Sequence, residues 1–430
     1  MQSFSPILRM ARPEDAPSIS KLYYEAYKPA NGSDPRQCYP FSQFLEPEWV
    51  GKIVGSSTIR WFVAEFEKEI IGTCGAVVNI GTKDDRVAEC FGLVIDKKWR
   101  LHHFGTELFK RLCDSLNVTE DAIFIIAETR TSHPGGWKVV KQCTFIPLGF
   151  EPYAHFTPAG SESMLLTGKI LPAALMKRKI GGKTSSWVYT LSESILRKLS
   201  CAPLSPQKSE DAYVLSAKMA VNKLSLLENP ACFAIPQTRN NTCDIEIYED
   251  ENARQPPEIL KNLTPHKAGI ISLKRLQGKD DKGIRYRRRY FLATLDNHLV
   301  AYALTVYDNS DKRLRILDLR TLFDGIQGII IQHILQQVVH DHIGSSLTVV
   351  VDVRADNVCL HATLTKLGFF PTGYYPALIA EADYRIDAVQ FTRLYNLDFE
   401  KARNSADFKE WPLATAVVSS ISERAGFKYG

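Results

Sequence analysis

Short apolar runs alternate with amphipathic segments over the first 170 residues of the chain. Residues with the pattern of strands cover 7–10, 60–67, 70–80, 87–95 and 122–128, and a last strand region begins at Gly149. Apolar residues recur at helical spacing over 16–27, 106–116 and 137–143. The predicted order is therefore β-α-β-β-β-α-β-α-β, which is typical of a layered α/β or α+β fold.

The same order returns in the second half of the chain. Two strand-like runs flank the turn residues Asp296 and Asn297, and a third strand, a long apolar helix, a buried strand and a shorter helix follow; these cover 291–295, 299–307, 314–319, 326–340, 347–353 and 357–367. The last helix is closed by Gly368, as expected for a helix end. This order repeats that of residues 60–150 and indicates an internal duplication at the scale of a domain.

Residues 169–242, between the two repeats, differ in character. A basic, glycine-containing segment at 177–183 precedes two helical stretches, 185–199 and 209–228, so we expect a helical connector. Lys177 stands where a phosphate-binding loop needs its first glycine, which argues against such a loop there. The predicted domains are 1–168, the connector 169–242, a second domain 243–396 and a C-terminal tail 397–430.

Composition narrows the class of protein. At 430 residues, with 45% hydrophobic and 23% charged residues, the chain has room for two or three ordinary globular domains. A net charge of +5 permits an anionic ligand, but it is too small to favour nucleic acid as a partner. The nine cysteines are scattered without metal-ligand spacing, and the chain has no signal-like or membrane-spanning apolar run. We therefore expect a cytoplasmic protein without a metal or a membrane span.

A basic loop over residues 94–106 joins the third strand to the following helix. The first backbone N–H groups of a helix have no partners within the helix, and the helix dipole is positive there. Such an end can bind a pyrophosphate, with Gly105 permitting a close approach and Arg100 supplying charge and donors.

This segment resembles the GNAT (N-acetyltransferase) superfamily, in which an Arg/Gln-x-x-Gly-x-Gly/Ala loop between a strand and a helix holds the pyrophosphate of acetyl-CoA. Arg100 and Gly105 match the motif, whereas His103 stands at its first glycine. The resemblance implies acetyl-CoA or another acyl-CoA as the donor. The residues that it places against the donor are Leu93, Val94, Ile95, Arg100, His103, Phe104, Gly105 and Thr106.

A second element of the family is a helix that ends in Gly-Phe before the last strands. Gly149 and Phe150 resemble it in the first half, and residues 357–369 resemble it more closely in the second. The loop at 318–328 has glycines but no arginine at the family's spacing. The resemblance thus implies two tandem GNAT-like domains, the second degenerate, each with a mixed, mostly antiparallel sheet flanked by helices.

Acyl transfer to an amine needs a group that accepts a proton from the amine. Glu89 begins the third strand and resembles the position of a catalytic glutamate in some family members, and Glu128 ends the next strand. Each could instead pair with a neighbouring arginine, Arg100 or Arg130. His133 could relay a proton or simply occupy a turn. Phe145 stands where many members have a tyrosine acid, a role that Tyr153 could take if it is not a core residue.

Two further segments have open interpretations. Residues 28–48 contain four prolines and are expected to be loop, and the aromatic stretch 39–44 within them could shape the acceptor pocket or cap the core. Arg285, Arg287 and Arg289 would share one face of a strand, suited to nucleic acid, to an acidic partner or to solvent.

The function that these residues favour is direct acyl transfer, in a ternary complex, to the amine of a small molecule or a peptide. Two alternatives remain. The donor could be an acyl carrier protein or a long-chain acyl group, as the basic residues around Lys97 would permit. The chain could also be a non-catalytic binding protein that keeps the fold.

Overall fold

The computed structural model describes residues 5–29, 32, 34–37, 41–100, 102–119, 121–132, 134–157, 160–207, 246–249, 286–295, 298–321, 326–342, 345–397 and 417. Two compact units contain these residues. The first comprises Met1–Arg178 and Tyr375–Arg385, and the second is built mainly from Lys179–Tyr374 and Ile386–Asp398. The predicted connector beyond residue 207, and the tail beyond 397 except Val417, lie outside the described residues. The predicted domain boundaries at 168 and 242 stay predictions.

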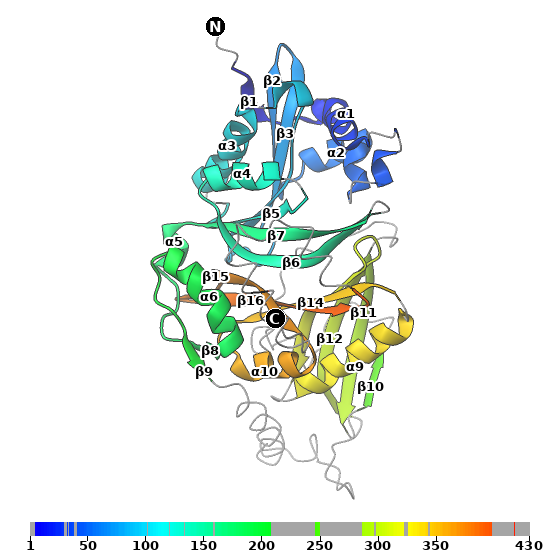
Figure 1. Cartoon of the computed structure of the whole chain (residues 1–430), viewed down its shortest axis with the longest axis vertical. Coiled ribbons are helices and arrows are strands. Elements are labelled where there is room, and N and C mark those ends of the chain that lie inside the picture. Colours follow the sequence, from blue (N-terminus) through cyan, green and yellow to red (C-terminus); the bar gives the residue numbers. More distant parts are fainter. Residues whose placement is uncertain are drawn as a thin grey trace, which may run out of the picture. The chain divides into compact units, whose positions relative to one another are not determined.

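The first unit contains a mixed, mostly antiparallel sheet (Figure 1). Its strands are β1 (Ile7–Met10), β2 (Ile59–Phe66), β3 (Glu69–Val78), β4 (Val87–Ile95), β5 (Phe124–Arg130), β6 (Ile146–Thr157) and β7 (Gly160–Ile170). Neighbouring strands follow the order β1-β2-β3-β4-β5-β7-β6. Only β4 and β5 run parallel, and the other pairs are antiparallel. The predicted order of strands and helices is confirmed.

Helices cover both faces of this sheet. Alternate residues of β2 pack into two different clusters, as a strand with both faces buried requires: Phe62 joins the cluster of α3 (Phe104–Val118) and α4 (Pro134–Gln142). Trp61 joins the cluster of α1 (Ala16–Tyr27) and α2 (Pro47–Val54). The sequence pattern does not predict α2, because prolines precede it. Pro47 is nevertheless compatible with the first helical turn, where its missing N–H has no role.

The second unit contains strands β10 (Glu246–Glu249), β11 (Tyr286–Leu295), β12 (His298–Asp308), β13 (Arg313–Thr321), β14 (Leu347–Arg354), β15 (Phe370–Ala380) and β16 (Arg385–Tyr395). Two longer helices, α9 (Ile326–Asp341) and α10 (Val358–Lys366), accompany them. The strand order β10-β11-β12-β13-β14-β16-β15 repeats that of the first unit position by position. In both units the parallel pair comes fourth and fifth and spans four residues of each strand. Arg285 lies outside the described residues.

The segment between the repeats is only partly helical where it is described. The predicted helix at 185–199 is observed as α6 (Ser186–Lys198), and a short helix α5 (Pro172–Leu175) precedes it. Two three-residue strands, β8 (Lys183–Ser185) and β9 (Ser205–Gln207), pair in parallel on either side of α6. The described part of the predicted helical connector thus contains the first expected helix and, in addition, two short strands.

The second half of β15 and the turn into β16, residues Tyr375–Arg385, belong to the first unit and contain one buried arginine. The Arg385 guanidinium donates to the carbonyl oxygens of Ala377 (2.6 Å), Leu378 (2.7 Å) and Asp85 (2.7 Å). The Asp85 carboxylate in turn accepts from the Ala380 N–H at 2.7 Å. A short loop before β4 and a segment some 300 residues later thus satisfy each other's buried polar groups.

Candidate functional site

The parallel strands β4 and β5 pair only at their beginnings. Val87–Cys90 of β4 pairs with Phe124–Ala127 of β5. Beyond this register β4 continues to Ile95 and β5 to Arg130, so the carboxyl ends of the two strands diverge. The candidate residues of the sequence gather around these two strand ends.

A bulge in β4 follows directly on the last parallel pair. Gly92 and Leu93 together oppose the single residue Cys74 of β3. Gly92 has a φ of +63°, a conformation that only glycine adopts without strain. The bulge therefore depends on a glycine at this position.

The extra residue reverses which side chains face which helices. Cys90 and Leu93 both pack into the cluster of α3, although three residues of a regular strand would separate them onto opposite faces. Phe91 and Val94 likewise both join the cluster of α1. Leu93, Val94 and Ile95, which the sequence analysis assigns to the donor, thus lie on the part of β4 that the bulge has turned.

An aromatic cluster fixes the loop between β4 and α3. The ring centroids of Phe66 and Trp99 lie 4.9 Å apart, and His102 lies 6.0 Å from Trp99 and stacks on Phe104 at 5.6 Å. Phe104 is the first residue of α3 and is buried. Its side chain therefore anchors the loop in the core, and its backbone N–H lies at the helix end.

His103 adopts a left-handed backbone conformation, which glycine tolerates best. It has φ 62° and ψ 4°, in the left-handed region, and it forms the N-cap of α3. Non-glycine residues are uncommon in this region, although histidine is among those enriched there. The backbone at this position of the loop is therefore one that glycine would adopt more easily than histidine.

The remaining donor candidates hold the loop and helix together. A Cβ on Gly105 would lie 3.3 Å from Ile95 Cγ1 and 3.8 Å from Val139 Cγ2, so this glycine allows α3 to pack closely. Thr106 Oγ1 donates to Gln142 Oε1 at 2.7 Å. The exposed side chain of Arg100 donates from Nε to the Ile95 carbonyl at 3.1 Å.

Glu89 and Glu128 lie on the same face of the sheet, at the point where β4 and β5 diverge. Glu89 is paired with Ile126, and Glu128 is two residues further along β5. Both side chains are half-buried. Arg130 pairs with Glu162, and the Arg100 side chain donates to the Ile95 carbonyl, so the alternative that either glutamate pairs with one of these arginines stays a prediction.

A polar group lies at the end of β5. Arg130 Nε donates to Glu162 Oε2 at 2.5 Å, and the other oxygen of Glu162 accepts from the Ser132 N–H at 3.1 Å. The Arg130 guanidinium lies 5.8 Å from the ring centroid of Tyr27 at the end of α1. Burial raises the pKa of Tyr27, so its phenol stays protonated at neutral pH.

Of the two proposed proton carriers, His133 lies outside the described residues. Tyr153 is 4% exposed, has a φ of +53° and stacks on Phe156 at a centroid distance of 6.2 Å. Its N–H donates to Ser163 Oγ at 3.2 Å, within an irregular stretch of the β6–β7 pairing.

His155 is a candidate that the sequence pattern does not indicate. It is 6% exposed and lies opposite Glu162 in the register of β6 and β7. Its ring lies edge-on to Phe41, with the ring centroids 5.7 Å apart. Phe41 belongs to the aromatic stretch 39–44, whose Tyr39 lies outside the described residues. His155 and Phe41 are more than 100 residues apart, so only the fold shows their contact.

The second unit carries different chemistry at the corresponding strand ends. Counted from the first parallel pair, Arg315 takes the place of Glu89, and Asp352 takes the place of Glu128. Arg315 Nη1 lies 3.8 Å from Asp352 Oδ2, and both side chains are buried. An ion pair thus joins the two strand ends where the first unit has two carboxylates.

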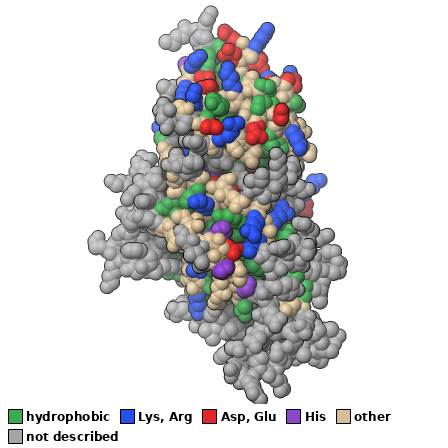
Figure 2. All heavy atoms as spheres, turned by 90° about the vertical axis from the view of Figure 1, so that its right-hand side faces the viewer, with side chains coloured by type: hydrophobic (Ala, Val, Ile, Leu, Met, Phe, Trp, Pro, Cys, Tyr) green, Lys and Arg blue, Asp and Glu red, His purple; other side chains and the backbone are tan. Residues whose placement is uncertain are grey.

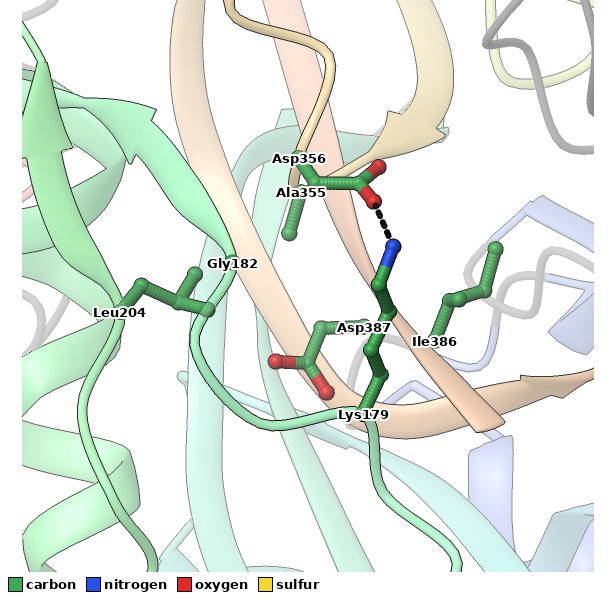
Figure 3. A pocket seen from close by; sticks show the side chains of 7 residues that line it. All are labelled: Lys179, Gly182, Leu204, Ala355, Asp356, Ile386 and Asp387. Carbon is green, nitrogen blue, oxygen red and sulfur yellow. Dashed lines mark hydrogen bonds and ion pairs between the residues drawn. The ribbon is translucent and has the colours of Figure 1, made fainter. Parts of the chain in front are cut away.

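A small pocket lies close to this point within the second unit (Figure 3). Lys179 Nζ reaches Asp356 Oδ2 at 3.4 Å, and the Arg354 guanidinium donates to both oxygens of Asp356 at 2.9 and 3.0 Å. Burial raises the pKa of Asp356, but the two cations outweigh it and lower the value overall. The remaining lining residues are Gly182, Leu204, Ala355, Ile386 and Asp387.

Within the described residues, no group of three or more His, Cys, Asp or Glu side chains is placed to hold a metal ion. None of the helices in the described part of the chain has the length and apolar character needed to cross a membrane. On the first unit, at the top of Figure 2, basic and acidic side chains are interspersed.

Comparison with known proteins gives a family match in the first half. The model of the acetyltransferase (GNAT) family matches residues 18–145. An acetyltransferase of this family from Streptococcus pneumoniae is 15% identical, with a TM-score of 0.32 over 38% of this chain and 98% of that chain.

Two other solved structures give similar values. A ribosomal-protein-alanine N-acetyltransferase from Brucella melitensis is 17% identical, with a TM-score of 0.30 over 38% of this chain and 99% of that one. A spermidine N-acetyltransferase from Vibrio cholerae, solved with CoA and spermine, is 18% identical, with a TM-score of 0.31 over 38% and 94%. No curated protein sequence matches the chain.

Proposed function

We propose that the chain is an N-acyltransferase that transfers an acyl group from an acyl-CoA to an amine, because the GNAT acetyltransferase model matches residues 18–145. The observation that carries this proposal is the divergence of β4 and β5, which lies inside the matched region beside the basic loop and the start of α3. The acceptor is the amine of a small molecule or a peptide.

The N-terminal turn of α3 suits the pyrophosphate of the donor. The first hydrogen bonds within α3 are donated by Thr106 and Glu107 to the His103 carbonyl. The N–H groups of Phe104 and Gly105 precede these bonds and lie at the positive end of the helix dipole. Together with the exposed guanidinium of Arg100, they form a group of donors that fits a phosphate.

The reaction needs one proton acceptor and one oxyanion donor. The protonated amine first loses a proton to Glu89 or Glu128, directly or through a water molecule. The neutral amine then attacks the thioester carbonyl and a C–N bond forms. The C–S bond breaks, and the departing thiolate takes up the proton that the attacking nitrogen gives up, so the products are the amide and the free thiol of CoA. A backbone N–H of the turned part of β4 stabilises the charge on the carbonyl oxygen. No covalent enzyme intermediate is needed.

We assign the second unit as a degenerate tandem copy of the first. Its strand order and parallel register support common ancestry of the two halves. Its Arg315–Asp352 ion pair occupies the position of the two glutamates and leaves no carboxylate pair for catalysis there. The six described free cysteines support action in a reducing compartment, which fits the cytoplasm.

A thermal-shift titration with CoA, acetyl-CoA and a long-chain acyl-CoA tests the donor, followed by an assay of CoA release with a panel of amines. A ligand at about 100 times its Kd stabilises the folded state by about 2.7 kcal/mol. Arg100→Ala should weaken the shift, and Lys98→Ala, an exposed neighbour of equal charge, should weaken it less. No shift with any donor would contradict the proposal.

An acyl carrier protein is the second candidate donor. The exposed side chains of Lys97, Lys98 and Arg100 are compatible with the acidic surface of such a protein. Capture of an acylated carrier protein, together with an absent shift for CoA, would favour it. If neither donor binds, a non-catalytic binding role replaces both.

A further inference from the structure

Three linked polar side chains lie inside an otherwise apolar cluster of the first unit. The cluster joins α1 and α2 to β2, β3 and β4, and its members are almost all aliphatic or aromatic. Trp61 Nε1 donates to Thr73 Oγ1 at 2.7 Å, and Thr73 Oγ1 donates to the Phe62 carbonyl at 3.2 Å. Thr73 also interacts with the hydroxyl of Tyr23. Trp61, Thr73 and Tyr23 are all at most 1% exposed, so each hydroxyl and N–H needs these partners.

The chain of hydrogen bonds ends on the bulge of β4. Tyr23 Oη donates to the Gly92 carbonyl oxygen at 2.6 Å. Burial raises the pKa of Tyr23 well above its usual value, so the phenol keeps the proton that it donates. A Cβ on residue 92 would lie 2.2 Å from Tyr23 Oη, so the hydroxyl can occupy this position only because residue 92 is a glycine.

This hydrogen bond sets the direction of the next backbone N–H. The peptide between Gly92 and Leu93 is planar and trans, so its C=O and N–H groups point in opposite directions. Since the carbonyl points to Tyr23 on α1, the Leu93 N–H points away from α1. Leu93 follows the last parallel pair of β4 and β5, where the two strands diverge.

We propose that Tyr23 is a positioning residue of acyl transfer, which holds the Gly92 carbonyl so that the Leu93 N–H faces the carbonyl oxygen of the donor thioester. The inference rests on the proposed function and adds a residue of α1 to its machinery. Negative charge develops on that oxygen during attack, and a donor that is already oriented needs no reorganisation at that moment. Tyr23 itself touches neither donor nor acceptor.

Tyr23→Phe tests the role, because it keeps the ring and removes only the hydroxyl. Loss of a whole oxyanion donor typically lowers kcat by roughly 10²–10³-fold, so a misdirected donor should lower it by about tenfold or more. The KM for the acyl donor should change less than about twofold, since the pyrophosphate contacts are untouched. Thermal-shift affinity for CoA should also be unchanged.

Trp61→Phe is the matched control. It removes the hydrogen bond that Trp61 donates to Thr73 and leaves the one that Tyr23 donates to the bulge, and phenylalanine keeps an aromatic ring against Phe91. The melting temperatures of both variants are measured beside kcat, so that loss of stability and loss of turnover can be separated. The positioning role predicts that only Tyr23→Phe lowers kcat.

Each other outcome contradicts the proposal in a distinct way. If the wild-type protein turns over and Tyr23→Phe has wild-type kcat, the positioning role is wrong and the proposed function stands. If both variants lose turnover in proportion to their stability, Tyr23 is only a core residue. If the wild-type protein neither binds CoA nor releases it with any amine, the proposed function fails and the positioning role fails with it.

Discussion

The two units share a strand order but differ at the place where their parallel strands diverge. In the first unit Glu89 and Glu128 lie there as two half-buried carboxylates. In the second, Arg315 and Asp352 take the same positions and form a buried ion pair. The pairing register needs only a backbone, whereas the chemistry needs particular side chains. A shared strand order within one chain therefore says little about whether the two units share a site.

The bulges show the same division between backbone and chemistry. In the second unit the register of β12 and β13 shifts between Leu304 and Thr305, which leaves Leu317 as the extra residue just after the parallel pair. In the first unit the bulge has a glycine held by the hydroxyl of Tyr23. Both units thus have a bulge shortly after the parallel pair, in β4 and in β13. In β4 a buried hydrogen bond from Tyr23 holds the bulge.

The largest effect is expected on kcat, from substitution of the two glutamates of the first unit. Glu89→Gln and Glu128→Gln keep shape and remove charge, and the variant that lacks the proton acceptor should lose roughly 10²-fold or more in kcat. Asp352→Asn, at the corresponding position of the second unit, should leave kcat of the folded protein unchanged. Steady-state release of CoA measures all three. Unchanged rates for both glutamine variants would remove these residues from the mechanism.

Acid stability should separate the units next. His361 is fully buried in the second unit, and burial lowers its pKa to about 4. Its unfolded pKa is about 6.5, so the unfolded chain binds a proton first as the pH falls. The second unit should therefore lose roughly 3 kcal/mol between pH 6.5 and pH 4, and no more from this group below pH 4.

Urea unfolding at pH 7 and pH 4.5 measures this loss, with His361→Gln as the control. Glutamine can still donate to the Arg354 carbonyl, which accepts from His361 at 2.8 Å. The variant should show a smaller difference between the two pH values. An equal difference in both proteins would mean that His361 does not control the acid response.

Removal of Arg385 should destabilise the first unit by roughly 4 kcal/mol or more. Arg385→Ala leaves the three carbonyl oxygens that it binds without their buried donor, and hydrogen bonds to charged groups are each worth about 1.5–3 kcal/mol. Differential scanning calorimetry should show the shift in the transition of the first unit. A shift confined to the second unit would place the β15–β16 tip differently.

The smallest effect is expected on stability, from substitution of His103 in the loop between β4 and α3. His103→Gly should stabilise the fold by roughly 0.5 kcal/mol, because the left-handed conformation costs a non-glycine residue more than glycine loses in entropy. It should also tighten CoA binding by restoring the motif. Lys68→Gly, at a φ of 68° in the β2–β3 turn, should give a similar stability change without any change in CoA affinity. Weaker CoA binding by His103→Gly would show that the imidazole itself contacts the donor.

Local patterns predict much of the fold. The helix Ala16–Tyr27 and the strand Val87–Ile95 coincide with their predicted bounds, because apolar periodicity is strong in both. The family motif likewise locates the loop that contains Arg100 and Gly105. Both kinds of signal depend on residues that are close in the sequence.

Long-range contacts carry the rest, and no local pattern contains them. Tyr23 and Gly92 are 69 residues apart. The pairing of strands distant in the sequence also decides that Arg315 has the same position in the second unit as Glu89 has in the first. His155 reads as an ordinary strand residue until Phe41 is seen beside it. The motif also does not reveal that His103 adopts a left-handed backbone conformation.

The number of acyl-CoA binding sites per chain tests whether only the first unit binds the donor. Isothermal titration of the full chain with CoA should give one site per chain, weakened by Arg100→Ala and unaffected by Asp352→Asn. One such site would mean that only the first unit binds the donor, although both units have the same strand order. Two equivalent sites, or a single site lost in Asp352→Asn, would contradict the account.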